Sequence, residues 1–306
     1  MPVDCDATDV AAGKVEFNGK PGAHCRKDPF RLCHYFRTDA VAGKYRYRMR
    51  HGRELIGVLP KMQDLWHYCD MAFRYLLFDA DNTILDFSAC EKTIISTLVH
   101  EFHLPERAPD GNDPVAVYRE INGNLWRNLE AGEIGPDELK VERFRRFLEA
   151  LGADGPGVPS ATELNGEFIR RLSGCGTMVP GAKDVLERFG PVHVVTNGFS
   201  AVQRSRITVA GLDRYIAGLH ISEEIGFAKP DVRFFDAVFS RLKTPDRSEC
   251  LIIGDSLTSD IQGGKNAGIA TCWFDRGSGS GGEAPNGLVP DYRISGLGEL
   301  ASIIRR

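Results

Sequence analysis

The chain has 306 residues, of which 42% are hydrophobic and 26% are charged, a composition typical of a globular protein with one or two domains. Its net charge of −4 offers no basic surface for nucleic acid, and no run of about 18 apolar residues is present to span a membrane. The first thirty residues lack the apolar segment of a signal peptide, so we predict a cytoplasmic protein. Its eight cysteines are then expected to be reduced thiols.

Residues 1–70 show no sustained helical periodicity. Residues 44–50 alternate basic with aromatic or apolar side chains, which fits an exposed strand or an arm that faces nucleic acid. We favour a simpler interpretation, a weakly ordered extension. Cys25, Cys33 and His34 lack the Cys-x2-Cys pair that would complete a zinc site, so we interpret them as incidental.

From Met71 onward, short apolar runs alternate with amphipathic stretches. The runs predict buried parallel strands at residues 74–78, 192–196, 218–221, 250–254 and 270–274. The stretches predict helices at residues 182–189, 201–210, 232–241, 261–267 and 297–304. This alternation is typical of a doubly wound α/β fold with a parallel sheet.

The long interval between the first two strands contains helical patterns only. They predict helices at residues 89–102, 115–130, 136–151 and 161–172. Ligands of open α/β sheets bind at the carboxyl ends of the strands. We therefore expect this all-helical insert to lie over the end of the first strand as a cap.

Polar side chains follow four of the predicted strands. They are Asp79 and Asp81 after the first, Thr196 and Asn197 after the second, Lys229 after the third, and Asp255 and Asp260 after the fourth. Two carboxylates can divide the work of nucleophile and proton donor, and a lysine can neutralise an anion. Taken singly, each residue fits an ordinary helix cap or surface charge. Their common position after buried strands favours one active site with oxygen ligands for magnesium.

These motifs resemble those of the haloacid dehalogenase superfamily, with Asp-x-Asp-x-Thr at 79–83 and Gly-Asp-x4-Asp at 254–260. Four longer segments resemble the noncanonical pyrimidine 5′-nucleotidases, at residues 78–83, 196–199, 221–230 and 267–273. The resemblance covers residues 72–304. It implies a Rossmann-like catalytic core at 71–87 and 177–306 and a helical cap at 88–176.

The resemblance begins almost at Met71, a residue that suits a chain start. We therefore interpret residues 1–70 as an upstream extension, either weakly ordered or the product of an over-long start assignment.

The resemblance also implies a mechanism. Asp79 would be the nucleophile that forms an aspartyl-phosphate, and Asp81 would protonate the leaving oxygen and later activate water. Mg²⁺ would be held by Asp79, Asp255 and the backbone carbonyl of Asp81.

Further residues would assist this reaction. Thr196, Asn197 and Lys229 would bind the transferring phosphoryl group. Thr83 and Asp260 would support the site, Asp260 by orienting Lys229.

The implied function is hydrolysis of pyrimidine nucleoside 5′-monophosphates, by a monomer or homodimer with no nucleic-acid or membrane partner. Phe87 and Trp126 are candidates to stack on the base, although aromatic side chains more often fill a helical core. Asp81 argues against dehalogenation, which has no alkoxide to protonate. The alternatives are a phosphatase for phosphoglycolate or a sugar phosphate, a phosphomutase, and a phosphate-binding regulatory protein.

Overall fold

The computed structural model describes residues 39–41, 44–48, 54–57, 72–243, 246–277 and 287–304. The chain divides into two compact units, Met1–Asp70 and Met71–Arg306. No helix within the described ranges is long and apolar enough to cross a membrane.

The smaller unit contains a three-stranded antiparallel sheet. Its strands are β1 (Asp39–Val41), β2 (Lys44–Arg48) and β3 (Glu54–Gly57), in the order β1-β2-β3. The segment that alternates basic with aromatic or apolar residues thus contains a strand over Lys44–Arg48. A strand was one of the interpretations of this segment, although we favoured a weakly ordered extension. The other residues of this unit, with the cysteines and histidine considered for zinc, lie outside the described residues.

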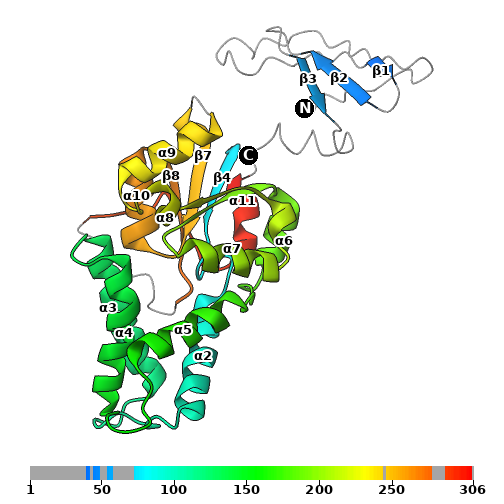
Figure 1. The fold of residues 1–306 in the computed structure, drawn as a ribbon. Coiled ribbons are helices and arrows are strands. Elements are labelled where there is room, and N and C mark those ends of the chain that lie inside the picture. Colours follow the sequence, from blue (N-terminus) through cyan, green and yellow to red (C-terminus); the bar gives the residue numbers. More distant parts are fainter. Residues whose placement is uncertain are drawn as a thin grey trace. The chain divides into compact units, whose positions relative to one another are not determined.

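The larger unit is built on a six-stranded sheet whose neighbouring strands are all parallel (Figure 1). In spatial order the strands are β6 (Ile216–Ile221), β5 (Val192–Thr196), β4 (Tyr75–Asp79), β7 (Cys250–Gly254), β8 (Ala270–Phe274) and β9 (Tyr292–Ile294). The predicted doubly wound α/β fold is confirmed. Strand β4 lies where the strand order reverses, and open α/β sheets bind their ligands at the carboxyl ends of the strands beside such a reversal.

Helices cover both faces of this sheet. The α-helices of the core are α6 (Ala182–Phe189), α7 (Ser200–Val209), α8 (Ser222–Ile225), α9 (Val232–Leu242), α10 (Gln262–Ala267) and α11 (Leu300–Ile304). Shorter turns of helix are η1 (Asp213–Tyr215), η2 (Arg247–Glu249), η3 (Leu257–Ile261, a π-helix) and η4 (Leu297–Glu299).

Alternation along the strands divides the apolar core into two clusters. Phe78 belongs to the cluster that includes α6 and α11, whereas its neighbour Leu77 belongs to the cluster that includes α9. Successive side chains of a strand point to opposite faces, so both faces of β4 are buried. Figure 1 shows α6 and α11 on one side of the sheet and α9 and α10 on the other.

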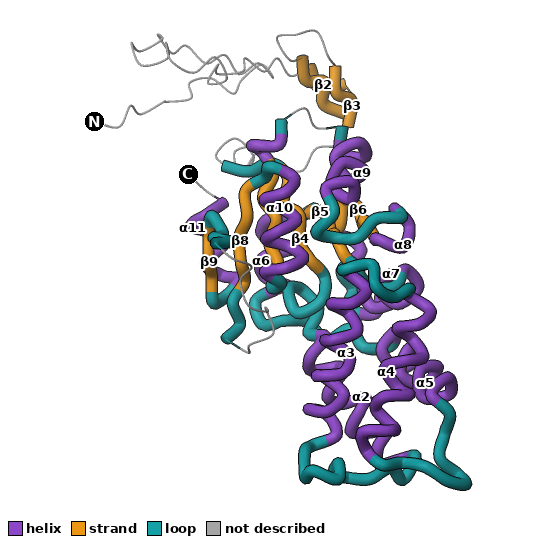
Figure 2. The backbone as a smooth tube through the Cα atoms, turned by 90° about the vertical axis from the view of Figure 1, so that its left-hand side faces the viewer, coloured by secondary structure: helices purple, strands orange, loops and turns teal. Residues whose placement is uncertain are grey.

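The insert between β4 and β5 forms a separate helical bundle (Figures 1 and 2). Its helices are α2 (Phe87–Glu101), α3 (Pro114–Glu130), α4 (Pro136–Leu151) and α5 (Ala161–Ser173), as predicted. They enclose their own apolar cluster, in which Tyr118, Phe144 and Phe168 are fully buried. Helix α5 begins at a capping box, because Ser160 accepts from the backbone of Glu163 and Glu163 bonds back.

A disulfide joins the two ends of the insert. Cys90, in the first turn of α2, is bonded to Cys175, just after α5. The prediction of reduced thiols is therefore wrong for this pair. The two residues are 85 positions apart, and only the folded bundle brings its first and last segments together. Cys250 and Cys272 are free and buried, as reduced side chains in strands are expected to be.

Candidate active site

Charged side chains meet at the carboxyl edge of the sheet. Asp79 is the last residue of β4, Asp255 directly follows β7, and Lys229 lies between α8 and α9. Lys229 Nζ lies 2.6 Å from Asp79 Oδ1 and 2.6 Å from Asp260 Oδ1, and it donates to the backbone oxygen of Val195 at 3.0 Å. All four charged groups are buried.

This cluster carries a surplus of negative charge. Burial raises the pKa of Asp79 to about 7, against the opposing attraction of Lys229. Burial also raises the pKa of Asp255, and repulsion from Asp79 and Asp260 adds to the rise. For Lys229, burial alone would lower the pKa, but Asp260 and Asp79 outweigh burial and raise it. Three buried carboxyl groups thus face a single ammonium group, which does not neutralise all of them.

The donor set of the cluster fits a hard divalent cation. One oxygen each of Asp79, Asp255 and Asp260 lie within 4.8 Å of one another. Carboxylate oxygens are preferred ligands of Mg²⁺, and a second positive centre would relieve the repulsion that raises these pKa values.

Asp260 is occupied by neighbours from within the protein. Its Oδ1 accepts from Lys229, and its Oδ2 accepts from the backbone N–H of Ser256 at 3.1 Å. The close approach requires glycine at position 254, because a Cβ there would lie 2.2 Å from Asp260 Oδ2. Both carboxylate oxygens of Asp260 are thus engaged by groups of the protein itself.

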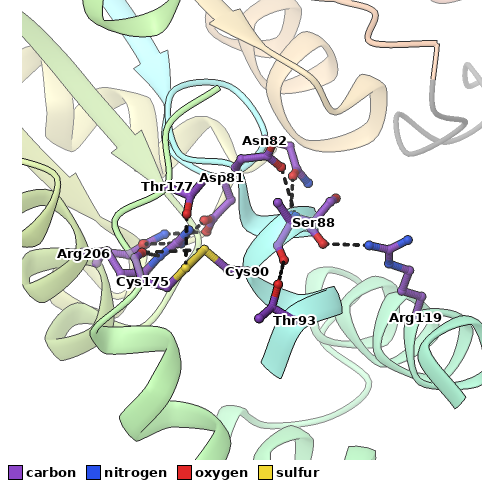
Figure 3. The surroundings of a disulfide bond; sticks show 12 residues. Asp81, Asn82, Ser88, Cys90, Thr93, Arg119, Cys175, Thr177 and Arg206 are labelled. Atoms are coloured by element: carbon purple, nitrogen blue, oxygen red, sulfur yellow. Dashed lines mark hydrogen bonds and ion pairs between the residues drawn. A yellow bond between two sulfur atoms is a disulfide. The ribbon is translucent and has the colours of Figure 1, made fainter. Parts of the chain in front are cut away.

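Asp81 is not part of the group of three carboxylates, and its side chain points to Arg206 of α7 (Figure 3). Its Oδ2 accepts from Gln203 at 2.6 Å, and its Oδ1 forms an ion pair with Arg206. The turn after Asp81 requires a positive φ of 60° at Asn82, a conformation that asparagine tolerates better than most residues. The two aspartates that follow β4 along the chain thus have different surroundings: Asp79 is buried beside Lys229, whereas Asp81 is partly exposed and contacts α7.

Thr196 and Asn197 lie beside the charged cluster. Thr196 Oγ1 accepts from the backbone of Gly198 at 3.1 Å and from Gln203 at 2.8 Å. The amide of Asn197 bonds both ways to the backbone of Lys229, at 2.9 Å each. Its side chain therefore ties the loop after β5, which begins at Asn197, to the loop that carries Lys229.

Thr83 is fully buried at the foot of the same turn. Its Oγ1 has no hydrogen-bond partner among the described residues, so its predicted supporting role stays a prediction.

The insert contributes side chains near this edge. Trp126 of α3 lies with its ring 5.7 Å from that of Phe199, and Lys140 of α4 lies 4.7 Å above the same ring. Phe87 packs against the apolar core of the insert, which is the ordinary role expected of such aromatic residues. Of the two stacking candidates, Trp126 is thus the one that faces the β5 loop.

Three residues near the site were missed from the sequence. Gln203 and Arg206 engage Asp81, and Glu130 lies at the end of α3, close enough to Asn197 and Asp260 for both to affect its pKa. Burial raises the pKa of Glu130 to about 7, with a further contribution from the charge of Asp260. The spacing of Gln203 and Arg206 on one helix face was the available signal, because their helix starts directly after the Thr196 motif.

Known proteins are similar to this chain in sequence and in fold. Residues 73–268 match the family model for haloacid dehalogenase-like hydrolases. The chain belongs to that family. Pyrimidine 5′-nucleotidase YjjG of Escherichia coli (strain K12) is 35% identical over 237 residues, which are 76% of this chain and 99% of YjjG. Pyrimidine 5′-nucleotidase PynA of Streptococcus pneumoniae is 35% identical over 209 residues, which are 67% of this chain and 85% of PynA.

A solved relative shares the fold of this hydrolase. The structure of the HAD-hydrolase YfnB from Bacillus subtilis, bound to magnesium, superposes with a TM-score of 0.66 at 34% identity. The match covers 76% of this chain and 98% of YfnB, and the crystal structure of YfnB reveals interdomain movement in that protein. The resemblance found in the sequence is confirmed, and the chain is an enzyme of the hydrolase class, similar to phosphoric monoester hydrolases.

Proposed function

We propose that this hydrolase cleaves phosphate from pyrimidine nucleoside 5′-monophosphates through an aspartyl-phosphate intermediate, with Mg²⁺ as cofactor. The observation that carries the proposal is the buried Lys229, 2.6 Å from Asp79 and held by Asp260, at the strand edge where Asp255 also lies. A carboxylate nucleophile and a phosphate ester are both anionic, so their approach needs positive charge between them. The similarity to YjjG and PynA supports the choice of substrate.

Asp79 is the nucleophile in this proposal. One of its carboxylate oxygens attacks phosphorus, and the bond between phosphorus and the ester oxygen breaks. Asp81 gives its proton to the leaving oxygen. Asp81 then takes a proton from water, the water oxygen attacks phosphorus, and the bond from phosphorus to Asp79 breaks to release inorganic phosphate.

Other residues bind and orient the phosphoryl group. Lys229 neutralises charge on its oxygens, and Thr196 with the backbone at Asn197 supplies hydrogen bonds. Asp79, Asp255 and the backbone carbonyl of Asp81 would hold Mg²⁺, which when bound supplies Lewis-acid stabilisation of the phosphoryl oxygens.

In this proposal the helical insert, residues 88–176, acts as the cap that selects the leaving group. The core comprises residues 71–87 and 177–306, and residues 1–70 are an extension outside this core. Trp126 is the favoured stacking residue for a base, because its ring meets Phe199 at the β5 loop.

The proposal is tested by phosphate release from a panel of esters with Mg²⁺ present. We expect UMP, dUMP and dTMP to be preferred over phosphoglycolate and sugar phosphates, and D79N to release no phosphate. A preference for phosphoglycolate or a sugar phosphate would overturn the substrate class. Full turnover by D79N would overturn the mechanism.

A further inference from the structure

Arg206, on α7, is fully buried although its side chain carries a permanent charge. Its Nη1 forms an ion pair with Asp81 Oδ1, and its Nε donates to the backbone oxygen of Cys175 at 3.1 Å (Figure 3). Within the described part of the chain, its Nη2 has no hydrogen-bond partner. A buried guanidinium is strongly unfavourable without a carboxylate beside it, so the contact with Asp81 is what stabilises this charge in the interior.

The same helix also holds the second oxygen of Asp81. Gln203 Nε2 donates to Asp81 Oδ2 at 2.6 Å and to Thr196 Oγ1 at 2.8 Å. Gln203 approaches the backbone of Gly198 closely, since a Cβ at that position would lie 2.4 Å from its Nε2. Helix α7 thus restrains both oxygens of a side chain that is itself 30% exposed. A partly exposed carboxylate would otherwise sample several rotamers.

The bond to Cys175 connects Asp81 to the insert. Cys175 follows α5, in the segment by which the chain returns from the helical bundle to the sheet, and its disulfide ties that segment to Cys90 of α2. One guanidinium group therefore contacts both Asp81 and this return segment. Movement of the return segment relative to α7 would displace Arg206 and, with it, the carboxyl group.

We propose that Arg206 is a positioning residue for Asp81, and that it makes the orientation of Asp81 depend on the return segment of the insert. The inference rests on the proposed function. Oδ1 of Asp81 is paired with Arg206, so Oδ2 is the oxygen that exchanges the proton. Oδ2 accepts one hydrogen bond from Gln203 and has a second lone pair for this exchange. The proton passes from Asp81 Oδ2 to the ester oxygen as the bond from phosphorus to that oxygen breaks.

A comparison of two leaving groups distinguishes a positioning role of Arg206 from a purely structural one. A nucleoside leaves as a strongly basic alkoxide and needs the proton of Asp81, whereas p-nitrophenolate is a stable anion that leaves without protonation. The ratio kcat/KM reports the steps up to transfer of the phosphoryl group, which include this protonation. Loss of Arg206 should therefore lower kcat/KM for UMP much more than for p-nitrophenyl phosphate.

The test measures both esters with R206M, R206K and a control. R206M should lose about 10- to 100-fold in kcat/KM with UMP and less than about 3-fold with p-nitrophenyl phosphate, as expected when a proton donor is misplaced. R206K keeps the charge and should recover part of the loss with UMP. The control is R204M, on the same helix, where Arg204 makes an exposed ion pair with Glu224, and it should match the wild-type chain.

A double-mutant cycle with D81N completes the test. If Arg206 acts through Asp81, adding R206M to D81N should change kcat/KM for UMP by less than about 2-fold. Equal losses with both esters in R206M, or a further 10-fold loss in the double variant, would overturn the inference. If R206M does not fold, R206K carries the same comparison, and a loss that is equal for the two esters refutes it. A wild-type chain that cleaves neither ester would instead refute the proposed function and the inference with it.

Discussion

Replacement of Lys229 by methionine tests how strongly burial increases the interactions between the charged groups at the carboxyl edge of the sheet. The ammonium lies 2.6 Å from each of two buried carboxylates, Asp79 and Asp260. Removing one partner from a buried ion pair costs about 3–5 kcal/mol, because the remaining charge is left unpaired. Lys265 offers a matched control, since it also lies 2.6 Å from an aspartate, Asp291, but both side chains are partly exposed. K265M should cost at most about 1 kcal/mol.

The free energy of unfolding of each variant is measured by urea denaturation in the presence of a chelator. The cost of K229M should be larger at pH 8 than at pH 6, because the pKa of Asp79, already raised to about 7 by burial, rises further without the lysine. At pH 6 the carboxyl group then takes up a proton and the repulsion is relieved. Equal costs for K229M and K265M at pH 8 would refute the reasoning that burial governs this site.

Three further predictions concern other parts of the chain. Burial raises the pKa of Glu130 from 4.5 to about 7 in the folded chain. The folded chain therefore keeps a proton that the unfolded chain releases above pH 4.5, and this contribution to the free energy of unfolding is lost as the pH rises toward 7. Relative to E130Q, the wild-type chain should lose about 1–2 kcal/mol of unfolding free energy between pH 5 and 8, allowing for partial exposure, and a flat difference would contradict this. Reduction of the Cys90–Cys175 disulfide, which closes a loop of 85 residues, should cost about 2–5 kcal/mol, whereas the same reductant should leave C90A unchanged. G254A should destabilise the fold by at least about 2 kcal/mol because its Cβ would lie 2.2 Å from a carboxylate oxygen, whereas G298A, where nothing lies within 4 Å, should be near neutral in thermal unfolding.

The central strands were predictable because both of their faces are buried. Strands β4, β5 and β7 are therefore almost continuous apolar runs that stand out in the sequence. Strand β9 lies at the edge of the sheet, has three residues and exposes Tyr292 and Arg293, so it carries no such pattern.

The charged residues of the site were predictable from their positions after strands, whereas their partners were not. The topology of a parallel sheet brings Asp79, Lys229 and Asp255 to one edge. The contact of Arg206 with Asp81 depends on how a helix packs against a turn 125 residues away. The Cys90–Cys175 bond likewise depends on the tertiary structure of the insert. Hydrophobic periodicity in a sequence predicts which face of a helix is buried, but it does not predict which polar group that face contacts.

The most direct test of the account is to identify the residue that carries phosphate during turnover. The reaction with UMP and Mg²⁺ is quenched in acid within the first turnovers, the protein is digested, and the peptides are examined by mass spectrometry. The account predicts one added phosphoryl group on Asp79, absent from D79N treated in the same way. Rapid turnover with an unmodified Asp79 peptide, or with the phosphoryl group on another residue, would contradict it.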